Sequence, residues 1–343
     1  DIDKLISSMD VSLSNGNLFG IVKFKLLIPH TRDADNEIFT SSMFSHLGVV
    51  SPRTFYTNVN VNGFYEGKFI FQEKATKELI ENHLFREGPI LEINEKYHWN
   101  TSTGMPFQED GNIFINGKIT NLNWSRRSKI NEFISLVALE KLNSSIFSTN
   151  SGDLNYFELA NDTSKLFLFD VLSESLDAMH GKINHNRKFY YDRISDSFEP
   201  IYYDGNSQIL DRETNLEEVP FKDYYVHYEY MSLAAKKLLS EINESLLNME
   251  NLYSDMKSKG ASFNEEEFEL GVERFIKNVK YLSTLTEDSE VSKKQKILRP
   301  ILNFNQFASI DDELIFYDLD SDSYKICDSF VKNCYNKINK KLN

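Results

Sequence analysis

Three oxygen-bearing side chains flank a short hairpin pattern in the middle of the chain. Asp177 and Asn186 precede the apolar run 189–191, and Asp204 follows the run 200–203. The two runs predict strands joined by a polar turn, and an antiparallel hairpin brings its two ends together. We therefore expect Asp177, Asn186 and Asp204 to lie side by side although the sequence separates them.

These three groups suit phosphoryl transfer. The reaction needs one carboxylate to receive a hydroxyl proton, and a carboxylate with an amide oxygen to hold Mg²⁺ on the phosphates. Asp177 would serve as the first, and Asn186 and Asp204 as the metal ligands. The order acid, amide, strand, turn, strand, acid is that of the catalytic loop and metal-binding Asp in protein-kinase-like folds. A surface hairpin with solvated Asp residues has the same spacing, so both interpretations stay open.

Length and charge limit what can surround such a site. The chain has 343 residues, enough for two subdomains with a full core. Its net charge of −14 and pI near 5.1 argue against a nucleic-acid partner, because a phosphate backbone needs a local basic patch. The dense basic run 337–341 reads as a solvated helix end. No apolar stretch approaches the roughly 20 residues of a membrane span.

The compartment and the thiols are less well defined. The chain begins at Asp1 without a Met or a signal peptide, so a cytoplasmic location and a secreted or cell-surface one, after removal of an N-terminal segment, stay open. Cys327 and Cys334 lie seven residues apart with no His between them, which gives no zinc pattern. On a helix that spacing is two turns, roughly 10 Å, which is too far for a disulfide. We therefore expect free core thiols unless the segment is not helical.

The elements that would position the site begin with a β-rich run over 20–28. Lys23 and Lys25 would project to one face of this strand, and a lysine directed into a cleft would pair with nucleotide phosphates. An edge strand with protective lysines is the other interpretation. Apolar residues at helical spacing then predict a helix over 36–47, with Gly48 as its C-terminal cap.

A hairpin completes the N-terminal region. The runs 54–61 and 64–72 predict strands on either side of Asn62-Gly63, the strongest two-residue turn signal in the chain. Glu73 ends the returning strand. The region is thus a small antiparallel sheet with one helix, which is the layout of a kinase N-lobe.

Helical patterns dominate after residue 125. Apolar stripes predict core-facing helices over 130–138, 167–176, 231–249 and 268–279. Ser262 and Glu265 form a capping-box pattern at the start of the last of these. A late pair of strands is expected at 313–317 and 323–327, and a final helix at 329–342.

Several common signatures are absent from the sequence. There is no Walker loop, dinucleotide fingerprint or Gly-x-Ser-x-Gly elbow, and none of the glycine-rich loop, His-Arg-Asp and Asp-Phe-Gly motifs of ordinary protein kinases. The acidic runs 33–37 and 318–322 lack the Gly and Glu of a calcium loop and read as solvated turns. A kinase interpretation must therefore be of an atypical kind.

Three blocks in a fixed order carry a family resemblance over roughly residues 15–210. They are Lys23-Phe-Lys25, then Leu47-Gly-Val-Val-Ser-Pro-Arg53 with the Asn62-Gly63 hairpin and Glu73, then the Asn186 strand with Pro200-Ile-Tyr-Tyr-Asp204. Together they resemble the CotH kinase family, which is named for spore-coat protein H. The resemblance implies an atypical protein-kinase-like fold that binds ATP and Mg²⁺ (or Mn²⁺) and phosphorylates proteins, itself included, on Ser or Thr.

The resemblance also implies roles for single residues. Asp177 is similar to the catalytic-loop acid, Asn186 to the amide that follows it, and Asp204 to the metal-binding Asp. Lys25 or Lys23 would hold phosphates, and Glu73 would pair with that lysine or line the hinge between the lobes.

The chain departs from the family pattern at three places. Asn206 stands where a second metal carboxylate is common. The loop after Asp177 is a few residues longer and contains His180 and His185, which makes Asp170 the alternative acid. The family's upstream Arg-Gly segment is not found, which indicates a diverged phosphate loop.

We expect an α+β fold of two lobes with ATP between them. A small antiparallel-sheet N-lobe would span 1–95, and a mostly helical C-lobe with a helical C-terminal extension would span 96–343. A kinase of a non-protein acceptor, such as a sugar or a surface polymer, fits the same residues. A non-catalytic pseudokinase scaffold also fits, and Asn206 favours it.

Overall fold

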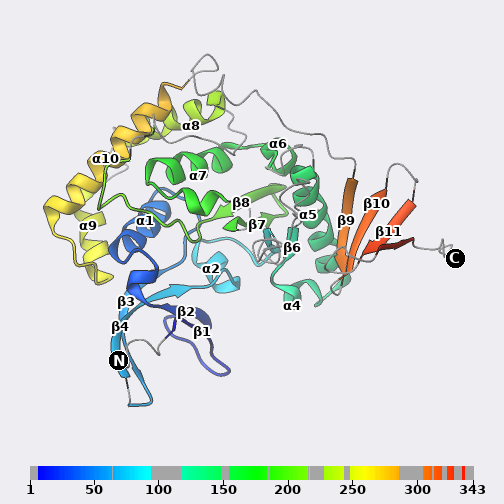
Figure 1. Cartoon of the computed structure of the whole chain (residues 1–343), viewed down its shortest axis with the longest axis horizontal. Coiled ribbons are helices and arrows are strands. Elements are labelled where there is room, and N and C mark those ends of the chain that lie inside the picture. Colours follow the sequence, from blue (N-terminus) through cyan, green and yellow to red (C-terminus); the bar gives the residue numbers. More distant parts are fainter. Residues whose placement is uncertain are drawn as a thin grey trace.

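The computed structural model describes most of the chain. It describes residues 7–63, 65–93, 117–147, 154–183, 186–214, 216, 228–242 and 248–285, and the backbone of the strands 304–310, 313–318, 323–327 and 334–336. Within these parts the chain is α+β, with three four-stranded sheets and the helices that pack on them (Figure 1). None of the described helices is long and apolar enough to cross a bilayer.

The first sheet has the strand order β1-β2-β4-β3, with every neighbouring pair antiparallel. Its strands are β1 (Met9–Ser12), β2 (Lys23–Leu27), β3 (Thr54–Val61) and β4 (Tyr65–Glu73). The predicted hairpin is confirmed, and Asn62 and Gly63 have the positive φ angles, 54° and 76°, that a tight hairpin turn needs. Phe24, Leu26, Phe69 and Phe71 form the small core of this sheet.

Helix α1 (Asp35–His46) joins β2 to β3 and packs on β3. The predicted helix is therefore confirmed, and Gly48, at φ 79°, caps its C-terminus while the Val49 N–H bonds the Phe44 carbonyl. The expectation that 33–37 is a solvated turn is wrong. Glu37 is buried on the inner face of α1, and Asp35 accepts hydrogen bonds from Ser262.

The second sheet has the order β6-β5-β7-β8 and lies in the middle of the molecule (Figure 1). Its strands are β5 (Ile90–Ile93), β6 (Gly117–Ile119), β7 (Lys188–Asp192) and β8 (Ser197–Ile201). The antiparallel β7–β8 hairpin confirms the two strands predicted around the candidate site. The Tyr202 N–H donates to the Val50 carbonyl at 2.8 Å, which ties the end of β8 to the loop after α1.

Most of the helices share one large core, and Leu79 and Ile80 lie in a separate, smaller cluster. The helices are α2 (Lys77–Asn82), α4 (Leu122–Ser125), α5 (Lys129–Phe147), α6 (Tyr156–Leu159), α7 (Ser164–Ser175), α8 (Tyr228–Glu241), α9 (Met249–Ser258) and α10 (Glu265–Ser283). Short 3₁₀ turns lie at η2 (Pro29–Thr31) and η4 (Met179–Lys182). Helices α7, α8 and α10 pack on one another, and α1 packs on α9 (Figure 1).

Three details of the helical prediction are wrong. Ile130 and Phe133 are 66% and 67% exposed, so the core face of α5 begins later, with Ile134 and the buried Ser135. The stripe over 231–249 is two helices, with Met249 at the start of α9. The capping box of α10 is formed by Asn264 and Glu267, two residues beyond the predicted position.

The C-terminal sheet has the order β12-β11-β10-β9. Its strands are β9 (Phe304–Ile310), β10 (Glu313–Asp318), β11 (Ser323–Cys327) and β12 (Cys334–Asn336), which confirms the predicted late pair. The predicted helix 329–342 is wrong, because β12 falls inside it. Cys327 and Cys334 face each other in the register of the antiparallel strands β11 and β12. The distance expected for two residues seven apart on a helix therefore does not apply to them. The division at residues 95 and 96 stays a prediction.

Candidate active site

The two predicted metal ligands meet at the ring of His180. The Asn186 Nδ2 donates to the His180 carbonyl at 3.0 Å and lies 3.0 Å from the His180 Nδ1. The same ring nitrogen lies 2.9 Å from the Asp204 carbonyl oxygen and 3.8 Å from the Asp204 Oδ1. Asn186 and Asp204 thus both contact the Nδ1 atom of one imidazole, whose pKa is lowered mainly by burial and further by Arg32.

The backbone around these residues is unusual. Asp177, Asp204 and Asn206 have left-handed φ angles of 52°, 54° and 52°. Gly205 between them is required, since a Cβ there would lie 2.6 Å from the Tyr202 hydroxyl oxygen. Non-glycine residues in this conformation are uncommon and concentrate at functional sites, so the clustering favours a site at the end of the hairpin.

Lys25 reaches this site from the first sheet. Its Nζ donates to the Tyr203 hydroxyl at 2.6 Å and lies 5.0 Å from the centre of that ring, next to Asp204. Lys23 lies on the same face of β2 and lines a cavity of about 280 Å³ together with Thr76, Asn121, Trp124 and Arg127. Both predicted lysines therefore point to the side of the sheet that faces the rest of the molecule.

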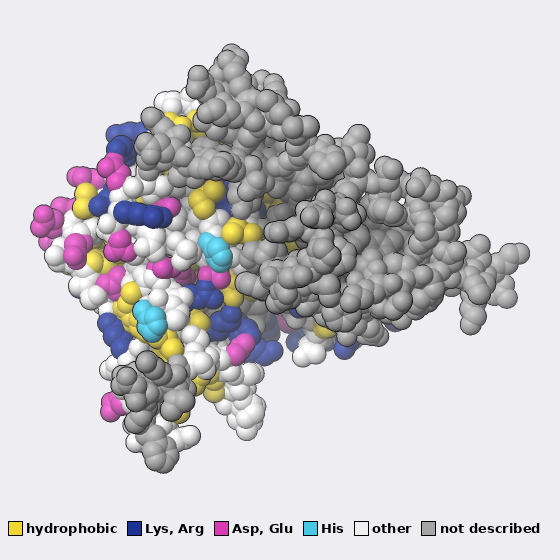
Figure 2. Space-filling view, viewed as in Figure 1, with side chains coloured by type: hydrophobic (Ala, Val, Ile, Leu, Met, Phe, Trp, Pro, Cys, Tyr) yellow, Lys and Arg dark blue, Asp and Glu magenta, His cyan; other side chains and the backbone are white. Residues whose placement is uncertain are grey.

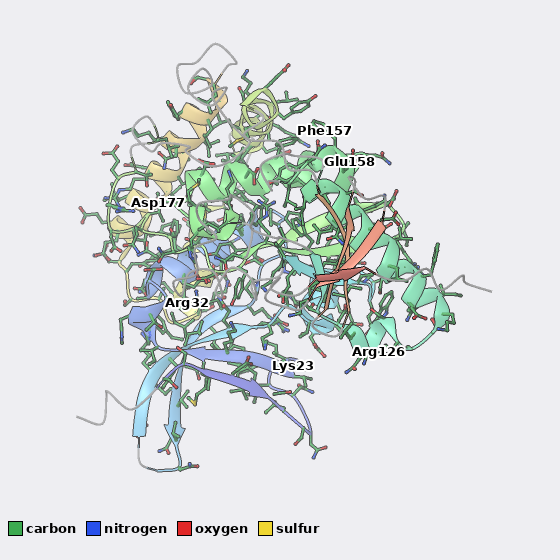
Figure 3. The ribbon with its side chains drawn as sticks, turned by 45° about the vertical axis from the view of Figure 1, so that its right-hand side comes forward. Lys23, Arg32, Arg126, Phe157, Glu158 and Asp177 are labelled. Atoms are coloured by element: carbon green, nitrogen blue, oxygen red, sulfur yellow. The ribbon has the colours of Figure 1, made fainter. Side chains whose placement is uncertain are left out.

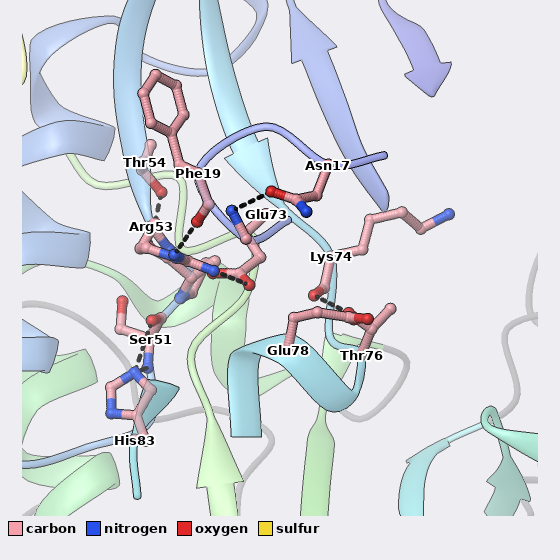
Figure 4. Close-up of polar contacts among 12 residues, drawn as sticks. Asn17, Phe19, Ser51, Arg53, Thr54, Glu73, Lys74, Thr76, Glu78 and His83 are labelled. Atoms are coloured by element: carbon pink, nitrogen blue, oxygen red, sulfur yellow. Dashed lines mark hydrogen bonds and ion pairs between the residues drawn. The ribbon is translucent and has the colours of Figure 1, made fainter. Parts of the chain in front are cut away.

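Glu73 does not pair with either lysine. It faces Phe24 across the β2–β4 ladder, so its side chain lies on the sheet face opposite Lys25. Its carboxylate is instead held by Arg53, at 2.8 Å from Nε and 2.7 Å from Nη2 (Figure 4). This bidentate pair corrects the predicted lysine partner and ties the loop after α1 to the end of β4. A position for Glu73 at the hinge between lobes stays a prediction.

Asp177 lies at the end of α7, with a different partner. Its Oδ2 is 3.3 Å from both the Nε and the Nη2 of Arg212. Burial raises the pKa of Asp177, and Arg212 partly offsets that rise. None of the contacts described for this part of the chain joins Asp177 to Asn186 or Asp204, and Figure 3 shows Asp177 farther from the first sheet than Arg32.

The alternative acid, Asp170, belongs to a buried network. The Tyr156 hydroxyl lies 2.8 Å from each of its carboxylate oxygens, and the Arg187 Nη1 lies 3.2 Å from one of them. Arg187 also donates to the Tyr156 hydroxyl at 2.8 Å. Because these partners occupy Asp170, it is better suited to holding α7 against β7 than to meeting an acceptor. His185 lies outside the described residues.

Two cations at the site, Arg32 and Lys188, were not predicted from the sequence. The Arg32 guanidinium forms an ion pair with the Asp204 carboxylate, and Figure 3 places Arg32 where the first sheet meets the helical part. The Lys188 Nζ lies 4.4 Å from the centre of the Tyr203 ring and 2.6 Å from the Glu92 Oε2. Basic and acidic side chains are interspersed among the residues that Figure 2 draws in colour.

Glu37 is a third residue that sequence reasoning missed. Its Oε1 accepts from the Gln72 Nε2 at 2.7 Å, and its Oε2 accepts from the Tyr202 hydroxyl at 2.9 Å. Burial raises its pKa from 4.5 to about 7. The adjacent Tyr202 and Tyr203 thus connect Glu37 and Lys25, respectively, to the strand end before Asp204.

The Glu37 carboxyl should make stability depend on pH. Its pKa is higher in the folded chain, so between pH 4.5 and about 7 the folded state keeps a proton that the unfolded state loses. The free energy of unfolding should therefore fall as pH rises through this window, by up to about 3 kcal/mol. Glu37→Gln should flatten this slope and be the more stable protein at pH 8, as urea unfolding at pH 5, 6.5 and 8 would measure. Equal slopes in the two proteins would contradict the burial argument.

The donor set suits a metal that arrives with its ligand. A carboxylate and an amide oxygen, from Asp204 and Asn186, are groups that Mg²⁺ accepts. In the described part of the chain, no group of three or more His, Cys, Asp and Glu is placed to hold a metal ion. Mg²⁺ is commonly held by one or two carboxylates together with substrate phosphates, so this sparse set fits a metal–nucleotide complex.

Comparison with known proteins leaves the geometry to carry the functional argument. No protein-family model matches the chain, and no curated protein matches it.

Proposed function

We propose that the chain is an ATP-dependent phosphotransferase, an atypical protein kinase similar to the CotH family. It would use ATP with Mg²⁺ or Mn²⁺ and transfer the γ-phosphate to Ser or Thr hydroxyls of a protein, itself included. The observation that carries the proposal is the 2.6 Å contact between Lys25 and Tyr203, which brings the first sheet to the residue before Asp204.

The order of the elements supports the proposal. In protein kinases the phosphate-binding Lys lies on a strand, a helix that follows supplies a Glu, and an Asn and an Asp hold the metal ions. Here Lys25 lies on β2, Glu37 on the next helix, and Asn186 and Asp204 on either side of the β7–β8 hairpin. One difference is that Glu37 contacts Tyr202 and Gln72 instead of the lysine.

Each side chain then has a definable task. Lys25 would bind phosphate oxygens, and the cavity beside Lys23, on the same face of β2, would take the nucleotide base. Asn186 and Asp204 would hold the metal ion, which when bound neutralises charge on the transferring phosphoryl group. Asp177 would orient the acceptor hydroxyl and receive its proton. The side chain of its partner Arg212 is 66% exposed, so breaking that ion pair costs little free energy.

Self-labelling tests the proposal most simply. The protein is incubated with γ-labelled ATP and Mg²⁺ or Mn²⁺, without added substrate, and the phosphate on protein is measured. We expect label that depends on the metal. Binding of ATP without any transfer would indicate a pseudokinase scaffold, which the Asn206 substitution favours. Consumption of ATP without protein label would indicate a non-protein acceptor. If the protein neither binds ATP nor transfers phosphate, the proposal is contradicted.

Asp177→Ala should separate chemistry from nucleotide binding. Because this acid acts on the acceptor, we expect turnover to fall by about 10²-fold or more while the ATP affinity stays nearly unchanged. Labelling rates and an ATP titration on the same preparation measure both. Full activity in Asp177→Ala would contradict this assignment, and activity lost in a folded Asp170→Ala would point to the alternative acid.

A further inference from the structure

Arg32 occupies the carboxylate that the proposed metal needs. Its guanidinium pairs with Asp204, and the two side chains are 22% and 16% exposed. A metal ion that binds the same oxygen, Asp204 Oδ1, would have to displace this cation. In this arrangement the Asp204 carboxylate is paired, and a guanidinium lies directly beside it.

Three cations converge on the ring of Tyr203. Lys25, Arg32 and Lys188 lie 5.0, 6.0 and 4.4 Å from its centre, measured from Nζ, Cζ and Nζ. Arg32 is neutralised by Asp204, and Lys188 by Glu92. Within the described part of the chain, no carboxylate is in ion-pair contact with Lys25, which bonds only the Tyr203 hydroxyl there. Among the described residues, Lys25 thus adds a positive charge that no carboxylate contacts, while the Asp33 and Glu37 carboxyl groups also act on Arg32.

The loop that carries Arg32 is held in place by several contacts. Asp33 and Ala34 both have left-handed φ angles, 53° and 49°, which is uncommon for two consecutive non-glycine residues. Gln208 donates to the Asp33 carboxylate at 2.8 Å, and Asn36 donates to Asp211 at 2.7 Å. Such a conformation persists only where the surroundings fix it, so the approach of Arg32 to Asp204 is built into the fold.

We propose that Arg32 is a polyphosphate ligand of the nucleotide site, and that Asp204 holds it until a metal–nucleotide complex arrives. On binding, the guanidinium would pass from the carboxylate to a phosphate oxygen, for which its planar donors are well suited. Asp204 would then be free for the metal ion. Arg32 and Lys25 would together do the work of the glycine-rich loop that the sequence lacks. The nucleotide part of this inference rests on the proposed function, whereas the polyphosphate part does not.

If Arg32 moves from Asp204 to a phosphate oxygen, Arg32→Gln should change the affinities for a metal ion and for polyphosphate in opposite directions. In Arg32→Gln the carboxylate has lost its competing cation, so the affinity for Mn²⁺ alone should rise severalfold. The affinity for inorganic tripolyphosphate in EDTA should fall by about tenfold or more, because a charge-assisted hydrogen bond is lost. A purely structural arginine would lower both affinities or neither.

Calorimetric titrations of the full chain test this. Mn²⁺ alone and tripolyphosphate with EDTA are titrated into the wild type, Arg32→Gln, Arg32→Lys and a control, Lys141→Gln. The control removes another cation from an ion pair with an aspartate, Asp196 at 2.5 Å, away from Tyr203. We expect the control to match the wild type and Arg32→Lys to lose part of the tripolyphosphate affinity. Unchanged tripolyphosphate binding in Arg32→Gln, or parallel loss of both affinities, would overturn the inference.

A second measurement covers the case in which Arg32→Gln does not fold. The wild type is treated with phenylglyoxal, and modification of Arg32 is followed by mass spectrometry with and without tripolyphosphate. Protection of Arg32, but not of the exposed Arg193, supports the inference, and no protection overturns it. If tripolyphosphate binding depends on Arg32 but no self-labelling occurs, the Arg32 anion site is supported and the proposed kinase activity is contradicted. If self-labelling is normal but Arg32 has no role in it or in tripolyphosphate binding, the kinase proposal is supported and the Arg32 inference is contradicted.

Discussion

Asp204→Ala is expected to abolish phosphoryl transfer, by at least about 10³-fold, and to remove the Mg²⁺-dependent part of ATP binding. The carboxylate is the only charged member of the proposed pair of metal ligands, Asn186 and Asp204. Without it the metal ion cannot be held where charge builds on the transferring phosphoryl group. Labelling rates and ATP titrations in Mg²⁺ and in EDTA measure the two effects.

Asp196→Ala is a matched control for this variant. Asp196 also has a left-handed φ angle, 53° against 54° for Asp204, and also pairs with a cation, Lys141. It lies in the turn of the β7–β8 hairpin, at the end away from the proposed metal ligands. We expect transfer to persist in this control. Transfer lost equally in both variants would mean that the hairpin had been disturbed, and transfer retained in Asp204→Ala would contradict the metal assignment.

Arg187→Met should cost about 3–5 kcal/mol of the free energy of unfolding, because it leaves the buried Asp170 carboxylate without the cation that contacts it and only the Lys182 charge nearby. Arg187 is 3% exposed, and its guanidinium lies 4.7 Å from the centre of the Phe169 ring and 5.3 Å from that of Phe189. Urea unfolding measures the loss. The change removes both the ion pair and these cation–π contacts.

Two comparisons give this stability prediction its control. Arg193→Met, in the exposed hairpin turn, should change the unfolding free energy by no more than about 0.5 kcal/mol. The double variant Asp170→Leu with Arg187→Met should lose less than the two single losses added together, since it leaves no unpaired charge. A loss near zero in Arg187→Met would show that the network contributes little.

Local signals predicted the β3–β4 hairpin and α1, but not β1, α2 or β5. The β3–β4 hairpin follows from alternation around Asn62-Gly63, and α1 follows from apolar spacing that ends at Gly48. Both signals lie within a few residues of the structure they specify. The predicted helix 329–342 is wrong because periodicity in a short stretch did not separate a helix from the three-residue strand β12.

The candidate site was only partly predictable. A hairpin brings its own ends together, so the neighbourhood of Asn186 and Asp204 could be argued from sequence. The Glu73 partner could not, because whether Glu73 shares a face with Lys25 depends on the register between β2 and β4, which pairs Lys25 with Gln72. Arg32 and Glu37 reach the site through the packing of α1 against the strand end after β8, and no local pattern records that contact.

The central claim is that Lys25 and Asp204 border one metal-dependent nucleotide site. Calorimetric titration of the wild-type chain with ATP, once in Mg²⁺ and once in EDTA, tests it most directly. The account predicts saturable binding of one ATP per chain, with an affinity about tenfold or more higher in Mg²⁺, since the metal adds its contact with Asp204. Absence of saturable ATP binding in both conditions would contradict it.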